Sequence, residues 1–247
     1  MLTLRAQERA IASAVEHFWQ TREVQSQKQQ SIGRSDRGGR SAVTAGRQMD
    51  GFVDLVRRVV VAAGLSEKCI HTSKSLELPG YFRPEKKWDL TVVDDDVLIA
   101  AVEFKSQIGP SFGNNFNNRS EEAIGTAQDL WTAYREGAFP HSHRPWLGYL
   151  MLLEDCHQST SAVTVRQPHF AVFPEFIDAS YSERYQLLLT RLVRERLYDS
   201  ACFLLSSKSV SRSYSFPDPN LSFFQMAGSL SGRINAYLNS GRVRGSR

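Results

Sequence analysis

The sequence contains little cysteine, no long hydrophobic run and no excess of glycine or proline. Its three cysteines are widely spaced, without a Cys-x-x-Cys pair or a Cys/His cluster, so we expect no disulfide scaffold and no zinc site but a reduced, cytoplasmic protein. Apolar runs such as 146–153 are far shorter than the roughly 20 residues of a membrane span. Glycine and proline near average usage exclude collagen-like and low-complexity chains. These absences leave a globular protein as the expected class.

The charge is modest in total but unevenly distributed. The 247 residues carry a formal net charge of +4, with a pI of about 9.0. Residues 1–48 hold eight Lys and Arg against four acids, and residues 227–247 hold four Arg and no acid. Basic segments favour a polyanionic partner, because Lys and Arg that neutralise phosphates gain from counterion release. A solvated basic surface explains the same pattern, so charge alone leaves both interpretations open.

The spacing of apolar residues predicts an α/β fold. A helix is expected over 2–30, followed by a Gly-, Ser- and Arg-rich loop over 31–48. The core has the order helix, three strands, helix, strand, and its elements are expected at 50–64, 69–72, 88–93, 97–104, 120–134 and 146–153. Residues 109–118 are then a loop, and Ser120 is the N-cap of the second core helix. A further helix, a strand and a last helix are expected at 183–196, 201–205 and 221–238.

The informative pattern lies on two strands that are expected to form a hairpin. If Asp94–Asp96 are the hairpin loop, Asp89 lies opposite Ala101 across the strand pair. Side chains alternate between the two faces of a sheet, so Asp89, Glu103 and Lys105 are expected on one face. Diagonal neighbours lie about 7–8 Å apart, which is close enough for two carboxylates to bind one divalent ion.

This set of residues suits metal-assisted hydrolysis of a phosphodiester. Mg²⁺ prefers oxygen ligands, so Asp89 and Glu103 together with a substrate phosphate would form its site. The ammonium group of Lys105 would orient the attacking water or stabilise charge that develops on the phosphate. The same residues also have a structural interpretation, in which Glu103 and Lys105 form an ordinary ion pair and Asp89 caps a strand end. Spacing alone does not choose between the two.

The segment AVEFK, with Asp89 on the preceding strand, resembles the core of the PD-(D/E)xK nucleases. The motif of that superfamily matches at Asp89, Glu103 and Lys105, with Trp88 in place of its proline. The runs FKSQIGPSFGNNFNNRSEEAIGTAQDLW and AVTAGRQMDGF resemble the XhoI-type restriction endonucleases more specifically. The layout agrees with that family along nearly the whole chain.

This resemblance implies a type II restriction endonuclease that requires Mg²⁺ and cuts double-stranded DNA at the palindrome CTCGAG, leaving 5′ overhangs. It also implies a homodimer, since a two-fold site needs one active centre per strand, and a functionally linked DNA methyltransferase. The chain is then expected to be one endonuclease domain over 1–247. Its parts are an N-terminal helix at 1–30, a basic loop at 31–48, a PD-(D/E)xK-like catalytic core with a three-stranded antiparallel meander at 49–154, and a C-terminal elaboration at 155–247.

Five polar residues shortly after Lys105 are candidates for DNA contact. They are Asn114, Asn115, Asn117, Asn118 and Arg119. Asn and Arg side chains offer the donor and acceptor pairs that recognise adenine and guanine edges in the major groove. The alternative is a turn-rich loop whose asparagines adopt left-handed conformations and cap the next helix. The resemblance favours DNA contact.

Residues before the sheet supply further candidates. Arg37, Arg40 and Arg47 belong either to a flap that folds over the duplex or to a linker. Asp50 begins the next helix, where some nucleases of the superfamily bring an extra carboxylate to the metal, and it is equally placed to be the N-cap. The tail at 240–247 is assigned no role.

Two other functions stay open at this point. The same core could serve a structure-specific nuclease in repair or junction resolution. A basic α/β protein in which Glu103 and Lys105 form a structural pair could instead bind nucleic acid without cleaving it. Discrete fragments from linear DNA, cleavage of branched DNA only, or binding without cleavage would distinguish the three.

Overall fold

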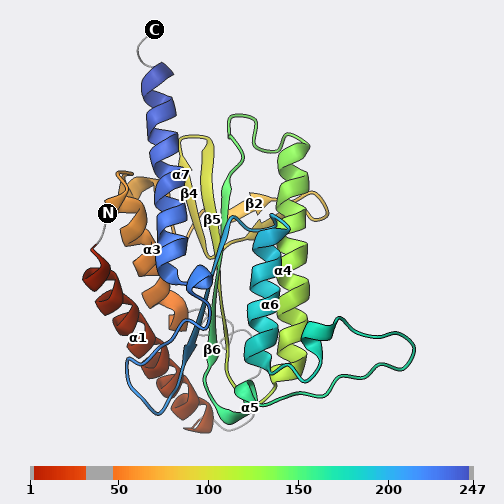
Figure 1. The fold of residues 1–247 in the computed structure, drawn as a ribbon. Helices are drawn as coiled ribbons and strands as arrows, with labels where there is room; N and C mark the ends of the chain where they lie inside the picture. Colours follow the sequence, from red (N-terminus) through yellow and green to blue (C-terminus); the bar gives the residue numbers. More distant parts are fainter. Residues whose placement is uncertain (1–2, 32–46, 245–247) are drawn as a thin grey trace.

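A computed structural model describes residues 3–31 and 47–244, and its framework is a five-stranded mixed sheet with helices on both faces (Figure 1). The strand order is β1-β4-β5-β6-β7. The strands span Ile70–His71 (β1), Leu90–Asp94 (β4), Val97–Gln107 (β5), Trp146–Glu154 (β6) and Ser200–Ser206 (β7). The first three are antiparallel neighbours, whereas β5, β6 and β7 run parallel.

Helices enclose the sheet on two sides. One face packs against α1 (Leu4–Ser31), α3 (Asp50–Ala62) and α7 (Phe223–Arg244), and the other against α4 (Phe112–Arg135) and α6 (Tyr181–Arg194). On β5, Val102 and Phe104 join the first core and Ala101 the second, as strand alternation requires. The short α5 (His157–Thr160) follows β6. None of the helices in the described part of the chain is long and apolar enough to cross a membrane.

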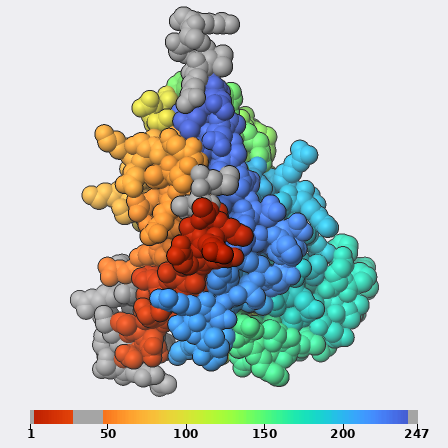
Figure 2. All heavy atoms as spheres, turned by 60° about the vertical axis from the view of Figure 1, so that its left-hand side comes forward, coloured from red at the N-terminus to blue at the C-terminus, as the bar shows by residue number. Residues whose placement is uncertain are grey.

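The two ends of the described chain contribute to one surface. In the space-filling view, α1 in red lies beside the blue C-terminal segments (Figure 2). The indole Nε1 of Trp19 on α1 donates a hydrogen bond to Ser206 Oγ at the end of β7, at 2.8 Å. An ion pair between Arg212 and Glu16, at 2.6 Å, joins the same regions. The first helix is therefore an integral part of this side of the fold.

The predicted order of helix, three strands, helix and strand is confirmed in α3, β1, β4, β5, α4 and β6. The sequence analysis missed a second, two-stranded sheet formed by β2 (Glu77–Pro79) and β3 (Glu85–Lys87). These strands have three residues each, mostly polar and exposed, so they lack the alternation that marks a half-buried strand. Their position between β1 and β4 places them directly before Asp89.

The predicted hairpin register was wrong. Thr91, not Asp89, lies opposite Ala101, because Asp94 pairs with Val97 across a two-residue turn and the register shifts near Val92. Leu90 pairs with Val102, so Asp89, the residue before Leu90, comes level with Glu103. The correction brings the two predicted metal ligands closer together than the diagonal arrangement expected from sequence.

The Asn-rich segment was predicted as a loop, and it is helical. Helix α4 begins at Phe112, and Ser120 lies within it, with its Oγ donating to the carbonyl of Phe116 at 2.9 Å, so Ser120 is not an N-cap. Phe112 stacks on Tyr181 with ring centroids 5.7 Å apart, and Phe116 makes an edge contact with Tyr185 at 5.1 Å. Packing against α6 thus outweighs the weak helix propensity of asparagine and glycine.

Candidate active site

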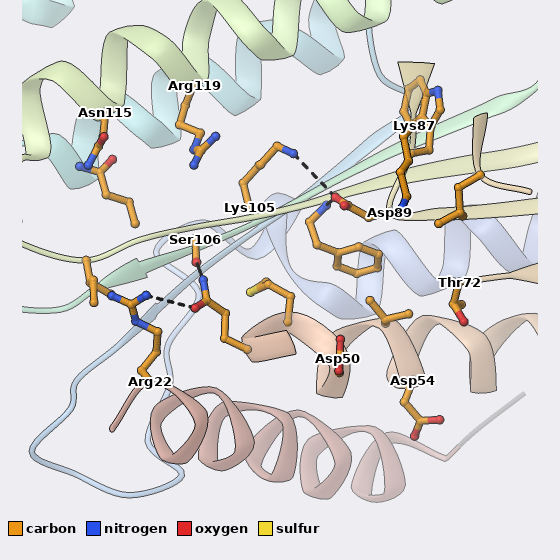
Figure 3. Close-up of a pocket in the computed structure, with 18 of the residues that line it drawn as sticks. Arg22, Asp50, Asp54, Thr72, Lys87, Asp89, Lys105, Ser106, Asn115 and Arg119 are labelled. Atoms are coloured by element: carbon orange, nitrogen blue, oxygen red, sulfur yellow. Dashed lines mark hydrogen bonds and ion pairs between the residues drawn. The ribbon is translucent and has the colours of Figure 1, made fainter. Parts of the chain in front are cut away.

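A polar cleft of about 990 Å³ opens along the end of β5 (Figure 3). Its lining residues include Arg22 from α1, Asp50 from α3, Asp89 from the bend before β4, Lys105 from β5, and Asn115 and Arg119 from α4. Figure 3 shows Arg119 and Asn115 approaching Lys105 from one side and Arg22 and Asp50 lying on the other. Cationic side chains from both walls thus face a floor that carries a carboxylate.

The structure brings Asp89, Glu103 and Lys105 together, as predicted. The ammonium Nζ of Lys105 lies 2.5 Å from Glu103 Oε2 and 3.7 Å from Asp89 Oδ2. Asp89 Oδ2 also accepts a hydrogen bond from the backbone N–H of Phe104 at 2.8 Å, which ties the carboxylate to β5. Lys105 therefore stands between two carboxylates at the edge of the cleft.

The two carboxylates repel one another. Burial and, second to it, the charge of Glu103 raise the pKa of Asp89 above its ordinary value. Burial alone would lower the pKa of Lys105, but Glu103 and Asp89 outweigh it and the net shift is upward. Lys105 is consequently held as an ammonium ion beside Asp89 and Glu103.

Asp89 and Glu103 fit a divalent cation. No cluster of three or more His, Cys, Asp or Glu side chains suited to a metal occurs among residues 3–31 and 47–244, so any site would combine these two carboxylates with water and substrate oxygens. Oxygen-only ligands of this kind are what Mg²⁺ prefers. The observation that supports the fit is that both carboxylates approach one cationic atom, Lys105 Nζ, which lies 3.7 Å from Asp89 Oδ2 and 2.5 Å from Glu103 Oε2.

Glu103 is less accessible than the other two residues. It is 2% exposed and lines a second cavity of about 280 Å³ on the α4 side, together with Lys105, Arg119 and Lys86. Lys105 lines both this cavity and the cleft, and its contact with Glu103 Oε2 lies between them. Lys105 is therefore the residue of the three that borders both spaces.

The predicted DNA contacts separate into two groups along α4. Asn115 and Arg119, one helical turn apart, line the cleft. Asn114, Asn117 and Asn118 are exposed and do not line it. Helical geometry, which the loop prediction did not include, explains this division.

The candidates before the sheet also differ in position. Arg47 is exposed in a short 3₁₀ turn, Arg47–Met49, while Arg37 and Arg40 lie outside the described residues. Asp50 lines the cleft as the first residue of α3, and the N-cap is Met49 without a side-chain cap, so the N-cap alternative for Asp50 is wrong.

Sequence reasoning missed a chain of polar contacts across the cleft. Arg22 Nη1 donates to Gln48 Oε1 at 3.2 Å, and Gln48 Nε2 donates to Ser106 Oγ at 2.9 Å (Figure 3). This chain links α1 to the strand residue that follows Lys105. Arg22 occupies the polar side of an amphipathic helix, where nothing in the local pattern distinguishes a cleft residue from a solvated one.

The chain is similar to known restriction enzymes. A family profile described as "Restriction endonuclease XhoI" matches residues 28–218. The chain is 55% identical over 178 residues to the type II restriction enzyme BstVI of Geobacillus stearothermophilus, covering 70% of this chain and 80% of that enzyme. It is 48% identical over 194 residues to the type II restriction enzyme XhoI of Xanthomonas vasicola, covering 78% and 77%. It is 54% identical over 170 residues to the type II restriction enzyme AbrI of Azospirillum brasilense, covering 68% and 76%. No solved structure matches.

Proposed function

The chain belongs to the XhoI restriction endonuclease family, and from this premise we propose that it cuts double-stranded DNA at CTCGAG, leaving 5′ overhangs, as an Mg²⁺-dependent homodimer. It is a type II restriction enzyme, and a divalent metal is implied by that class. The observation that carries the assignment of the active centre is the convergence of Asp89, Glu103 and Lys105 at the cleft edge.

We assign each of the three residues a role in phosphodiester hydrolysis. Asp89 and Glu103 would hold the divalent ion, which when bound polarises the phosphoryl group and lowers the pKa of a coordinated water. Lys105 keeps its proton because both carboxylates raise its pKa, so it offers a positive charge to the oxygens of the scissile phosphate. The Phe104 N–H holds Asp89 in place, so this carboxylate does not have to be ordered when substrate arrives.

The arrangement of elements supports a PD-(D/E)xK core. Helix α3, the antiparallel strands β1, β4 and β5, helix α4 and strand β6 follow in the order expected for that superfamily. Asp89 precedes the second strand of this meander, and Glu103 and Lys105 lie on the third. These positions support the assignment of the three residues to a nuclease site of this kind.

The walls of the cleft are suited to a DNA backbone. Arg22 on one side and Arg119 on the other can each contact a phosphate oxygen, and Asn115 lies one turn from Arg119, within the same lining. One protomer supplies one such centre, and cutting both strands of a palindrome needs two related by a two-fold axis. This requirement, together with the family, supports the homodimer and the need for a methyltransferase that protects the host site.

Cleavage of defined DNA tests the proposal. A linear duplex with a single CTCGAG should give two fragments with Mg²⁺, whereas a duplex with one base of the site changed and a chelated reaction should stay intact. Cleavage of branched DNA only would favour a structure-specific nuclease, and a gel shift without any cleavage would favour a binding protein. Sedimentation of the DNA complex should give two protomers per duplex.

The contribution of α4 can be tested with a matched pair of variants. Asn115→Ala should weaken binding to CTCGAG by about 1–3 kcal/mol if its amide contacts a base edge. Asn117→Ala removes the same side chain from an exposed position outside the cleft and should bind like wild type. Equal losses in both variants would show that the cleft does not define the DNA-contacting face of the helix.

A further inference from the structure

Two lysines share one buried glutamate at the active centre. Glu103 Oε2 accepts from Lys105 at 2.5 Å, and Glu103 Oε1 accepts from Lys86 on β3. The Glu103 side chain is 3% exposed, and a buried carboxylate is costly unless charged or polar partners compensate for its lost hydration. Both oxygens of this expected metal ligand are therefore already neutralised, one by each lysine.

The two lysines occupy different places. Lys105 lines the cleft and also approaches Asp89, so it can turn toward a phosphate there. Lys86 does not line the cleft; it lines the second cavity, on the α4 side of Glu103, beside Tyr149 and Arg119. Lys86 thus lies outside the cleft lining, so we expect any effect that it has on the reaction to act through the glutamate.

Lys86 is fixed by its surroundings. Its Nζ donates to the carbonyl of Lys87 at 2.9 Å and lies 4.6 Å from the centre of the Trp88 ring, which is itself almost fully buried. Lys86 pairs with Leu78 in the β2–β3 sheet, and its neighbours Glu85 and Lys87 are exposed on the opposite side of the strand. The hairpin therefore presents one inward lysine to Glu103 at a defined position.

Two other cations near Glu103 form ion pairs with other carboxylates, and the Nε of Arg119 has no hydrogen-bond partner. Arg83 and Arg119 line the same cavity, but Arg83 is paired with Asp129 at 2.7 Å and Arg119 with Glu122 at 2.5 Å. If Lys105 leaves Glu103 for a phosphate, Lys86 is the cation that stays beside the carboxylate. Partners of a metal ligand that hold it in position in this way commonly matter for metal affinity.

We propose that Lys86 is a positioning residue, which holds Glu103 by Oε1 so that Oε2 can turn with Asp89 toward the metal when Lys105 moves to the substrate phosphate. The proposal rests on the function proposed above and adds to it the β2–β3 hairpin as the support of the metal ligand. Lys86 itself touches neither DNA nor the reacting phosphate.

Metal titration of Lys86→Met, which keeps an unbranched side chain up to Cε and removes the ammonium group, tests the proposal. Calorimetric titration with Mn²⁺ should show binding weakened about 10–100-fold, and half-maximal cleavage should need correspondingly more Mg²⁺. Lys86→Arg, which restores a cation, should recover most of the affinity. DNA binding without metal should be unchanged, because Lys86 lies outside the cleft.

Two controls make the result specific. Lys74→Met removes an exposed lysine from the loop before β2 and should leave both metal titrations at wild-type values. In a Glu103→Gln background, adding Lys86→Met should cause no further loss of Mn²⁺ affinity, since Lys86 acts through Glu103. Should Lys86→Met fail to fold, Lys86→Gln, which keeps an N–H donor without charge, serves the same titration and should show a smaller loss.

Mn²⁺ affinity at or above the wild-type value in the Lys86 variants would overturn the proposal, because Lys86 would then be irrelevant to the metal or a competitor for Glu103. A further loss in the Glu103→Gln background would also overturn it. Failure of the wild-type protein to cut CTCGAG would contradict the proposed function instead, and the Mn²⁺ titrations would still report on Lys86.

Discussion

Two buried carboxylates flank the β2–β3 hairpin, and the protein treats them differently. Asp129 on α4 accepts hydrogen bonds from the backbone N–H groups of Tyr81 and Phe82 at 2.7 and 2.8 Å, and from Arg83 Nε at 2.7 Å. Glu103 on β5 meets the ammonium groups of two lysines, Lys86 and Lys105. The first carboxylate closes a turn, while the second shares one of its partners, Lys105, with Asp89 at the cleft.

The pKa shifts follow the same division. Burial opposes ionisation of Asp129, but the bonds from Phe82, Tyr81 and Arg83 outweigh it and hold its pKa below the ordinary value. At the cleft, burial and the charge of Glu103 raise the pKa of Asp89. A carboxylate that stabilises the fold is thus fully satisfied, whereas the carboxylates expected to bind metal retain repulsion that a cation would relieve. Functional sites commonly lower the stability of the fold because their arrangement serves activity.

The sharpest test of this comparison is removal of each carboxylate with cleavage as the readout. Glu103→Ala should lower the cleavage rate by at least about a hundred-fold, because it removes a metal ligand from the transition state. Specific DNA binding should persist, since Glu103 lies behind the cleft. Asp129→Asn should cut DNA at the wild-type rate per folded molecule. Unchanged cleavage by Glu103→Ala would remove this residue from the mechanism.

Asp129→Asn should leave cleavage unchanged but should lower the stability of the fold. Asp129→Asn leaves fewer acceptor sites for two backbone N–H groups and Arg83, so the free energy of unfolding should fall by about 2–3 kcal/mol. Urea denaturation with chelator present measures this. The exposed Glu85→Gln, on the same hairpin, is the control and should stay within about 0.5 kcal/mol of wild type. A loss of that small size for Asp129→Asn would contradict the structural role.

The stability difference between wild type and Asp129→Asn should depend on pH as the lowered pKa of Asp129 requires. Its carboxyl titrates near an ordinary pKa of about 3.9 in the unfolded chain and below that value in the folded protein. Its contribution to stability is therefore fully present above about pH 4 and is lost as the pH falls through the folded-state pKa. The stabilities of wild type and Asp129→Asn should converge at acid pH. A constant gap down to the acid transition would show that the charge is not what stabilises the turn.

The smallest expected effect is a gain in stability at the active centre. Asp89→Asn keeps an oxygen that can accept from the Phe104 N–H but removes the repulsion with Glu103. The free energy of unfolding at neutral pH, measured with chelator, should rise by up to about 1 kcal/mol while cleavage is lost. A clear loss of stability would mean that the ion pair of Asp89 with Lys105 outweighs the repulsion.

The structure brings the three predicted site residues together, but their positions differ from the prediction in detail. Strand alternation and the nuclease-like motif located Asp89, Glu103 and Lys105 on one face, because the two-residue period of a strand is a local property. The predicted register of the β4–β5 hairpin was wrong, because the two-residue turn and the irregularity near Val92 depend on how the strands pair. The loop prediction for Asn114 to Asn118 failed because contacts of Phe112 and Phe116 with α6 stabilise the helix.

The sequence by itself determined the α/β class, the order of the core elements and the identity of the charged residues on β5, since these follow from periodicity and residue chemistry within short windows. Only the tertiary structure decided that Arg22 and Arg119 face each other across one cleft and that Asn115 alone among the asparagines of α4 lines it. It also placed Lys86 behind Glu103. Such neighbours come from segments far apart in the chain, and only the packing of helices and hairpin against the sheet brings them together.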